Sequence, residues 1–177
     1  MRILLFRTEE PKVHILEQRH LDQIQAVDKS IELFAPLAAN KKEVQTYLAE
    51  AEALAGFPRD LAKISLARTP QLKWIHSFSA GMEMVLTPEL KASNIIVSNS
   101  SGVHAIPIAE HVLACILLFA KKFYQGFQNQ QQKIWQPLEK MTEIRDATLL
   151  VVGLGRIGTE IAKVTAGSGM YVIAIDR

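Results

Sequence analysis

The chain has 177 residues, of which 49% are hydrophobic and 21% are charged. This composition lies near ordinary globular usage, and it excludes a disordered chain, a collagen-like repeat and a disulfide-rich miniprotein. Lys and Arg number 20 and Asp and Glu number 18, so the net charge of +2 gives no reason to expect a nucleic acid or an anionic membrane as partner. The length fits one large domain, or one domain with part of another.

Cys115 is the only cysteine, and it lies in an apolar stretch typical of a helix. A single cysteine excludes disulfides within the chain and thiolate metal clusters, and we predict no metal site. The N-terminus turns polar by Thr8, so it lacks the long apolar run of a signal peptide. These features favour a protein of the reducing cytoplasm.

The stretch from Val103 to Ala120 is apolar enough to be weighed as a membrane span. Its interior contains His104, Pro107, Glu110 and His111. Charged or helix-breaking groups at that depth are costly in hydrocarbon. The sequence therefore predicts a buried helix of a globular domain.

Short apolar runs alternate with helical patterns over residues 1 to 99. We predict five strands, at 2–6, 31–34, 53–57, 72–76 and 94–98. Helical stretches are expected at 11–27, 42–51 and 60–68, and from Thr87-Pro88, where threonine caps a helix and proline occupies its first position. Such alternation implies right-handed crossovers and a parallel sheet covered on both faces, so these residues are predicted to form a doubly wound α/β domain.

A long helix is predicted next, from His104 to about Phe127. The glutamine-rich stretch from Gln125 to Gln132 either continues that helix or forms its exposed end. The α/β pattern then restarts with a strand at 148–152, a helix to about Ser168 and a strand at 170–175. The second half of the chain is thus expected to contain a further strand-helix-strand unit.

A glycine motif, Gly-Leu-Gly-Arg-Ile-Gly at 153–158, follows the strand at 148–152 and opens the next helix. In dinucleotide-binding units the first glycine permits a tight turn, the second lets the backbone approach a pyrophosphate, and the third lets the helix pack closely on the strand. The helix N-terminus offers unpaired N–H groups to the anion. A tight connection without a ligand is the alternative. We predict that the cofactor contacts Gly153, Gly155, Arg156, Ile157 and Gly158.

Asp176 ends the second strand of this unit, 18 residues after Gly158. A carboxylate in this position accepts hydrogen bonds from the ribose hydroxyls and repels a 2′-phosphate, which favours NAD over NADP. Arg177 keeps the choice open, because a guanidinium beside the ribose can pair with a 2′-phosphate. We assign Arg177 to the adenine side or to solvent, and we predict NAD as the cofactor.

Three stretches resemble the D-isomer-specific 2-hydroxyacid dehydrogenases in order and spacing: LKWIHSFSAG at 72–81, VSNSSGVHAIPIAEH at 97–111 and VGLGRIG at 152–158. The second is the most specific, because its Asn-x-x-Gly turn feeding a long helix is not a general feature of dinucleotide-binding folds. The resemblance spans nearly the whole chain. It implies a flavodoxin-like parallel-sheet substrate domain at 1–99. At 100–177 it implies an interdomain helix and the first βαβ unit of a Rossmann NAD-binding domain.

The same resemblance implies a small D-2-hydroxy or 2-oxo acid as substrate, bound in a cleft between the two domains. A loop after the fourth strand would present backbone N–H groups to the substrate carboxylate. Glu83, just after this loop, replaces the aspartate common in the family and so affects the loop's local hydrogen bonding but not the fold. The substrate-binding residues implied are Gly56, Phe57, Ser79, Ala80 and Gly81.

The family's catalytic arginine, histidine and orienting acid follow the second Rossmann strand, so we assign no catalytic residue in this chain. His76, His104 and His111 are interpreted as structural. Two Rossmann strands and one helix leave sheet faces and edges uncovered. We therefore expect the N-terminal portion of a longer dehydrogenase, with no turnover of its own. The apolar surface of residues 106–119 is expected to be buried against another subunit or against the missing domain, and we expect a homodimer in the full-length form.

Two other functions remain open at this point. The same fold occurs in corepressors that bind NAD(H) as a conformational ligand, so the chain is alternatively an NAD(H)-responsive binding protein without catalysis. The third possibility is a nonfunctional gene fragment.

Overall fold

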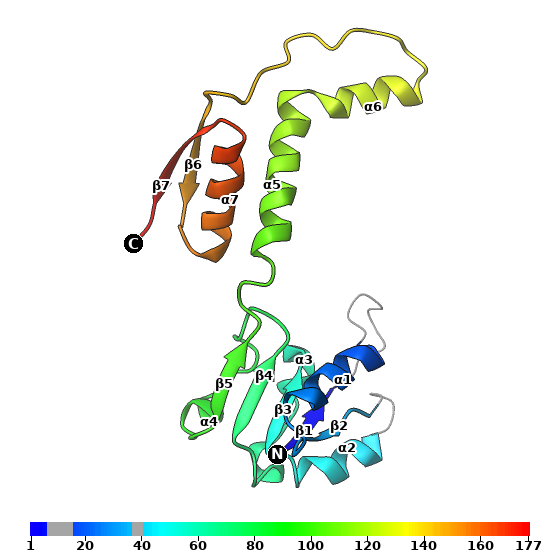
Figure 1. The fold of residues 1–177 in the computed structure, drawn as a ribbon, viewed down its shortest axis with the longest axis vertical. Coiled ribbons are helices and arrows are strands. Elements are labelled where there is room, and N and C mark those ends of the chain that lie inside the picture. The colour runs from blue at the N-terminus through cyan, green and yellow to red at the C-terminus, as the bar shows by residue number, and fades with distance from the viewer. Residues whose placement is uncertain (7–15, 37–40) are drawn as a thin grey trace. The chain divides into compact units, whose positions relative to one another are not determined.

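The computed structural model describes residues 1–6, 16–36 and 41–177. These residues form two compact units, Met1–Ser101 and Gly102–Arg177 (Figure 1). Each unit contains its own parallel sheet.

The first unit is built on a five-stranded parallel sheet with the order β2-β1-β3-β4-β5. This strand order is that of flavodoxin-like folds, so the predicted fold class is confirmed. The strands are β1 (Arg2–Leu5), β2 (Glu32–Phe34), β3 (Ala53–Gly56), β4 (Trp74–Ser77) and β5 (Ile96–Asn99). The helices are α1 (Gln18–Val27), α2 (Lys41–Leu48), α3 (Pro58–Leu61) and α4 (Pro88–Lys91).

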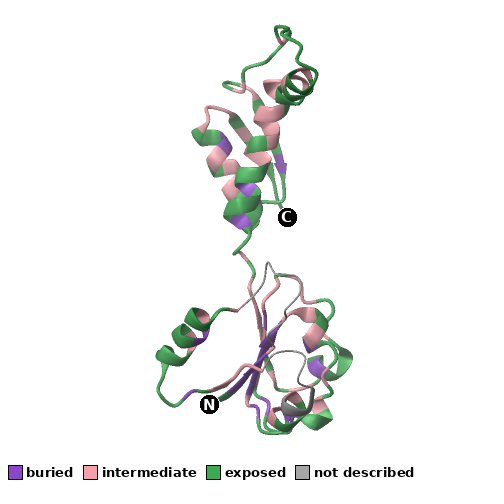
Figure 2. Ribbon diagram, turned by 90° about the vertical axis from the view of Figure 1, so that its right-hand side faces the viewer, coloured by how far each residue is buried: buried purple, intermediate pink, exposed green. Residues whose placement is uncertain are grey.

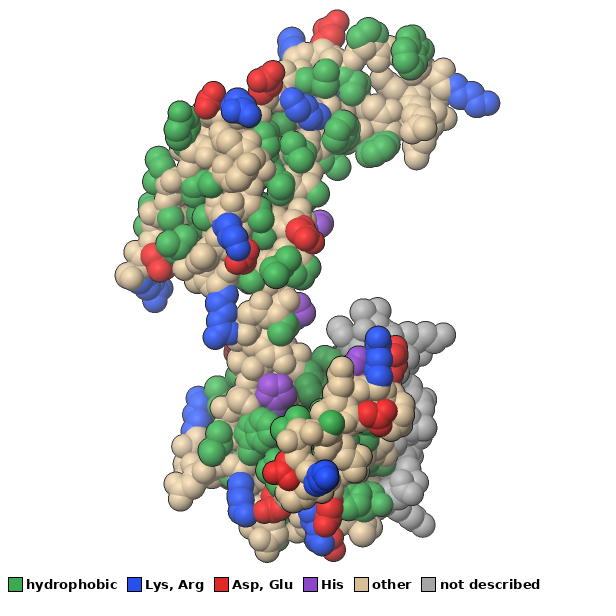
Figure 3. Space-filling model, viewed as in Figure 1, with side chains coloured by type: hydrophobic (Ala, Val, Ile, Leu, Met, Phe, Trp, Pro, Cys, Tyr) green, Lys and Arg blue, Asp and Glu red, His purple; other side chains and the backbone are tan. Residues whose placement is uncertain are grey.

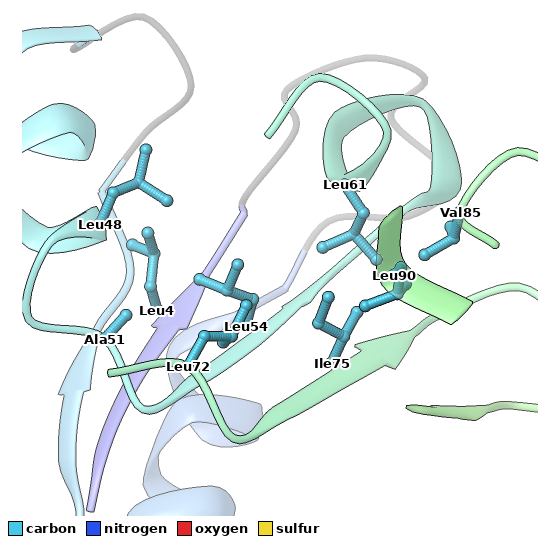
Figure 4. Close-up of a cluster of buried hydrophobic side chains, with 9 residues drawn as sticks. All are labelled: Leu4, Leu48, Ala51, Leu54, Leu61, Leu72, Ile75, Val85 and Leu90. Atoms are coloured by element: carbon cyan, nitrogen blue, oxygen red, sulfur yellow. The ribbon is translucent and has the colours of Figure 1, made fainter. Parts of the chain in front are cut away.

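Both faces of this sheet are buried, as the continuous apolar runs of its strands require. Successive strand residues point to opposite faces, so Leu4 joins one cluster while Ile3 and Leu5 join the other. Leu21 of α1 packs in the second cluster. Figure 4 shows the first cluster, to which α2, α3 and α4 contribute; it comprises Leu4, Leu48, Ala51, Leu54, Leu61, Leu72, Ile75, Val85 and Leu90. Figure 2 shows the buried residues concentrated along the strands of this sheet.

Two of the expected helices differ from the structure. Residues 11–15 of the helix predicted at 11–27 lie outside the described residues, and α1 begins at Gln18. The helix predicted at 60–68 is instead α3 followed by a 3-10 turn at Leu66–Arg68. Leu61 and Leu66 both pack on the first cluster. In an uninterrupted helix their side chains would point about 140° apart, so the break brings Leu66 to the core.

The Thr87-Pro88 signal is confirmed. Pro88 is the first residue of α4, and the Thr87 side chain accepts a hydrogen bond from the N–H of Leu90 at 3.2 Å. Leu90 is thereby delivered to the core, and the chain leaves α4 toward β5.

The second unit contains α5 (Ala105–Ala120), α6 (Phe123–Gln131), β6 (Thr148–Val152), α7 (Arg156–Gly167) and β7 (Tyr171–Ile175). Strands β6 and β7 are parallel, with Val152 opposite Ile175. Ala105 and Ala109 of α5 are buried, and α5 packs along α7. Many hydrophobic side chains of this unit remain on its surface (Figure 3).

The single helix predicted from His104 to about Phe127 is wrong, because two helices meet there. Lys122 adopts a left-handed conformation with φ 53° and ψ 34°, which ends α5 and starts α6. The returning loop satisfies the freed C-terminal carbonyl of Ala120, which accepts a hydrogen bond from the N–H of Thr142 at 2.9 Å. Most of the glutamine-rich stretch therefore lies in a separate helix. No helix within the described residues is long and apolar enough to cross a membrane.

Candidate functional site

The glycine motif of the second unit forms the turn between β6 and α7. Gly153 has a φ of +94°, a conformation that favours glycine, and its N–H donates to the carbonyl of Ile175 at 2.7 Å. A Cβ at Gly158 would collide with the carbonyl oxygen of Gly153. Gly153 and Gly158 are thus needed by the fold itself, whether or not a ligand is bound.

Gly155 has different surroundings. It is the N-cap residue of α7 with a φ of −69°, and apart from Gly155 itself and its two chain neighbours, no atom of the described residues lies within 4 Å of the position that a Cβ would occupy. Neither backbone strain nor packing therefore requires glycine there. The first N–H groups of a helix have no partner within the helix and attract anions. Open space above these groups is what a bound pyrophosphate needs.

Two further contacts shape this turn, and the sequence motif alone does not reveal them. The hydroxyl of Thr159 donates to the carbonyl of Leu154 at 3.1 Å, which ties the turn to the first turn of α7. The side chain of Arg156 lies against Gly102, whose φ is +102°; a Cβ at Gly102 would be 3.0 Å from Arg156 Cδ. The Asn-x-x-Gly pattern was the only sequence signal for Gly102.

A cavity of about 580 Å³ opens beside the turn. It is lined by the glycine turn, the first turns of α7 and the start of α5, through Gly102, Ala105, Ile106, Leu154, Gly155, Arg156, Thr159 and Glu160. Ile157 is exposed at the first turn of α7. Asp176 follows β7 directly and is exposed next to Ile175, the residue bonded to Gly153.

The loop Ser79–Gly81 follows the carboxyl end of β4 in the first unit. The N–H of Ser79 donates to Ser77 Oγ at 3.2 Å, and the carbonyl of Ser79 accepts from the N–H of Ser100 at 3.3 Å. The carbonyl of Ala80 accepts from Asn99 Nδ2 at 2.6 Å. Within the described residues, the N–H groups of Ala80 and Gly81 have no hydrogen-bond partner. The carbonyls are thus tied down, while these two donors remain available.

The other residues assigned to the substrate side lie beside this loop. Gly56 is opposite Ser77 in the sheet, and its glycine is explained by packing, since a Cβ there would be 2.9 Å from Phe6 Cβ. The ring of Phe57 packs edge-on against that of Phe78, with centroids 5.6 Å apart. A Cβ at Gly81 would be 2.7 Å from Glu83 Oε2, so the Glu83 carboxylate lies next to the loop.

The histidines have separate surroundings. His76 is half-buried, and its ring nitrogens lie 2.9 Å from Ser98 Oγ and 3.3 Å from Ser100 Oγ. Burial lowers the pKa of His76 below its ordinary value. His104 and His111 are exposed near the start of α5, and the described residues contain no group of His, Cys, Asp and Glu able to hold a metal ion.

Comparisons with known proteins agree with these features. Residues 113–177 match the family described as D-isomer specific 2-hydroxyacid dehydrogenase, NAD binding domain. The glyoxylate reductase of Thermococcus litoralis is 29% identical over 180 residues, which cover 95% of this chain and 54% of the relative. The D-3-phosphoglycerate dehydrogenase of a Synechocystis species is 30% identical over 145 residues, which cover 76% of this chain and 26% of the relative.

Solved structures show the same fold. A D-isomer specific 2-hydroxyacid dehydrogenase family protein from Aeromonas salmonicida has a TM-score of 0.81 at 24% identity, covering 99% of this chain and 54% of that one. The D-lactate dehydrogenase of Aquifex aeolicus, solved with NAD and lactic acid, has a TM-score of 0.66 at 25% identity, covering 99% of this chain and 52% of that one. The chain spans about half the length of these solved relatives. It belongs to the family of D-isomer specific 2-hydroxyacid dehydrogenases.

Proposed function

We propose that these residues supply the first half of the cofactor site and the substrate-carboxylate loop of an NAD-dependent oxidoreductase. The reaction is hydride transfer between NAD(H) and a small D-2-hydroxy or 2-oxo acid. The observation that carries the proposal is the contrast within the glycine turn. Gly158 is required by packing against Gly153, whereas Gly155 leaves open space over a helix N-terminus. A purely structural turn gives no reason for the second glycine.

The residues of the second unit fit the phosphate and ribose parts of a dinucleotide. The N–H groups at the start of α7 would bind the pyrophosphate, with Arg156 and Ile157 beside it. Asp176 would accept hydrogen bonds from the adenosine ribose, which favours NAD because a 2′-phosphate would be repelled. When bound, NAD(H) supplies the hydride acceptor or donor.

The first unit fits a small carboxylate. Among the residues that the structure describes, the N–H groups of Ala80 and Gly81 have no hydrogen-bond partner, and the carbonyls of Ser79 and Ala80 are held by Ser100 and Asn99. Backbone N–H groups without protein partners can bind an anion without a cationic side chain. Gly56 and Phe57 lie beside the loop and would contact the rest of the acid.

The proposal assigns no proton-transfer group to these residues. His104, just before α5, and His111, on α5, are exposed, and both ring nitrogens of His76 are within hydrogen-bond distance of serines. General acid-base catalysis typically contributes a factor of about 10² to 10⁴. We therefore expect no measurable turnover from residues 1–177 alone. We also propose that the protein works as a homodimer.

ADP-ribose is the appropriate probe, because it contains the pyrophosphate and ribose groups and lacks the nicotinamide. In titration calorimetry the 177-residue chain should bind it, and Gly155→Ala should bind it at least about tenfold more weakly by filling the space over the donors. Gly167→Ala is the matched control, because Gly167 also has open space around it but lies at the other end of α7. Equal affinity for all three chains, or none in the wild type, would refute the cofactor assignment.

A further inference from the structure

A row of hydrogen bonds crosses from β4 to β5 in the first unit. Trp74 Nε1 donates to Ser98 Oγ at 2.8 Å, and Ser98 Oγ lies 2.9 Å from His76 Nδ1. His76 Nε2 lies 3.3 Å from Ser100 Oγ, which is 3.2 Å from the carbonyl of Ser77. The row therefore runs from an indole to a backbone carbonyl, with the imidazole at its centre.

The two ends of the row fix its direction. The indole nitrogen of Trp74 only donates, so Ser98 accepts there, and its hydroxyl hydrogen is left for His76 Nδ1. The carbonyl of Ser77 only accepts, so it takes the hydroxyl hydrogen of Ser100, whose oxygen then accepts from His76 Nε2–H. When His76 is neutral and protonated at Nε2, each N–H and O–H group in the row donates one hydrogen bond.

The far end of this row is joined to the Ser79–Gly81 loop. The N–H of Ser100 donates to the carbonyls of both Ser77 and Ser79, at 3.1 and 3.3 Å. The Ser77 side chain, which is fully buried, accepts from the N–H of Ser79. Ser100 is thus the residue that ties β5 to the first residue of the loop, and His76 bonds its side chain.

We propose that His76 is a positioning residue, which holds Ser100 and through it the Ser79–Gly81 loop in the geometry that presents the Ala80 and Gly81 N–H groups to an anion. The inference rests on the proposed carboxylate-binding function of this loop. Packing alone does not require histidine here, because the ring lies in an aromatic row, 5.9 Å from the rings of both Trp74 and Phe78. A phenylalanine would fill that space without offering a donor.

The first test is spectroscopic. Nitrogen-15 NMR of the imidazole distinguishes the two neutral forms, and the His76 ring should carry its proton on Nε2 at neutral pH. Hydrogen exchange of the Ser100 amide should be slow in the wild type. It should become about threefold to tenfold faster in His76→Phe, the loss expected for one ordinary hydrogen bond. His76→Gln, which keeps an N–H group able to reach Ser100, should restore slow exchange.

The second test uses glycolate as a carboxylate probe and neutral glycolamide as its control. Glycolate should shift the amide signals of Ala80 and Gly81 in the wild type, and glycolamide should not. His76→Phe should weaken glycolate binding by about threefold to tenfold, and His76→Gln should restore it. Ser100→Ala should match His76→Phe, and the double variant should lose little more, because the two residues act through one contact.

The outcomes of these tests distinguish the carboxylate-binding function proposed for the loop from the positioning role proposed for His76. Wild-type Ala80 and Gly81 signals that ignore glycolate would contradict the function proposed for the loop, and Ser100 exchange would then decide alone whether His76 positions it. Glycolate binding and Ser100 exchange that are the same in His76→Phe as in the wild type would overturn the inference. So would a His76 ring protonated at Nδ1.

Discussion

Gly155 and Gly158 belong to one six-residue motif but have opposite surroundings. The motif, read as a sequence, treats them alike, because a glycine has no side chain that reveals its reason. In the structure, the Gly153 carbonyl leaves no room for a Cβ at Gly158, whereas Gly155 faces open space. Only the latter points to a ligand, and for that reason the cofactor assignment is tested at Gly155.

Asp176 determines the cofactor preference that we expect. The wild-type chain should bind ADP-ribose more tightly than its 2′-phosphorylated form, and Asp176→Ala should narrow or reverse this preference by removing the repulsion of the phosphate. Titration calorimetry with both ligands measures the ratio. Arg177→Ala is the control, and it should leave ADP-ribose affinity nearly unchanged. Equal wild-type affinity for the two ligands, insensitive to Asp176→Ala, would contradict the assignment.

We expect the free energy of unfolding to depend on pH through His76. Burial places its pKa below the ordinary 6.5, and the groups bonded to its ring nitrogens, Ser98 and Ser100, are uncharged. The unfolded chain therefore binds this proton at higher pH than the folded chain, and the free energy of unfolding falls as pH drops from 7 through the folded pKa. Denaturant titrations at several pH values, followed by Trp74 fluorescence, measure this loss.

The variant His76→Gln should remove that part of the pH dependence, and an unchanged pH profile would show that another group is responsible.

The carboxylates of Asp28 and Glu52 affect the stability of the fold at lower pH than His76 does. Hydrogen bonds from Ser30 to Asp28 and from Lys73 to Glu52 lower the pKa values of these carboxylates below the ordinary 3.8 and 4.5. Their contribution to stability is present above those values and is lost as pH falls further.

Contacts between residues that are distant in the chain could not be predicted from the sequence. The sequence interprets His76 as structural, but its hydrogen-bond partners cannot be read from the sequence. Ser98 and Ser100 lie 22 and 24 residues further along the chain, and only the pairing of β4 with β5 brings them to the imidazole. The same holds for Arg156 and Gly102, which come together because α5 packs against α7.

At the scale of elements, strands were easier to predict than helix ends. The strand expected at 148–152 is found with the same bounds, because a run of apolar and β-branched residues between polar and glycine residues leaves little choice. The end of α5 was missed because it contains neither glycine nor proline. Lys122 takes the left-handed position there, and a lysine gives no signal for that conformation.

From the left-handed conformation of Lys122 between α5 and α6, we predict a stabilising substitution. Lys122→Gly should raise the free energy of unfolding by about 0.5–1 kcal/mol, because glycine adopts a φ of 53° without the steric cost that a Cβ imposes. Lys121→Gly is the control, since Lys121 has a φ of −95° and gains nothing from glycine. Thermal and denaturant unfolding measure both variants. A Lys122→Gly chain less stable than the wild type would show that the lysine side chain itself holds the break.

At the scale of the whole molecule, the second unit exposes more apolar surface than an isolated globular unit usually does. Exposed side chains come from both strands, from α5 and α6, and from the loop that follows α6; they include Ile106, Phe119, Phe127, Trp135, Leu150, Val152, Ile173 and Ile175. The sequence pattern anticipated this for residues 106–119. It did not predict the exposure of Trp135, because a single aromatic residue in a polar loop belongs to no periodic apolar pattern.

We expect this unit to associate with a second copy of the chain. Light scattering and sedimentation should show a dimer at micromolar to millimolar concentration, and Trp135→Ala should weaken it without changing the fold, since the Trp135 side chain is fully exposed. Val27→Ala, at an exposed apolar position of the first unit, is the control and should leave association unchanged. A wild-type chain that stays monomeric over this range would count against the homodimer.

We expect the turn between β6 and α7 to bind the pyrophosphate of a dinucleotide. The most direct test is amide NMR of the isotope-labelled 177-residue chain titrated with ADP-ribose. We predict that the largest shifts occur at Gly153–Gly158 and at Asp176 and Arg177, and that Gly155→Ala reduces them. Shifts concentrated elsewhere in the chain, or no shifts at millimolar ADP-ribose, would contradict it.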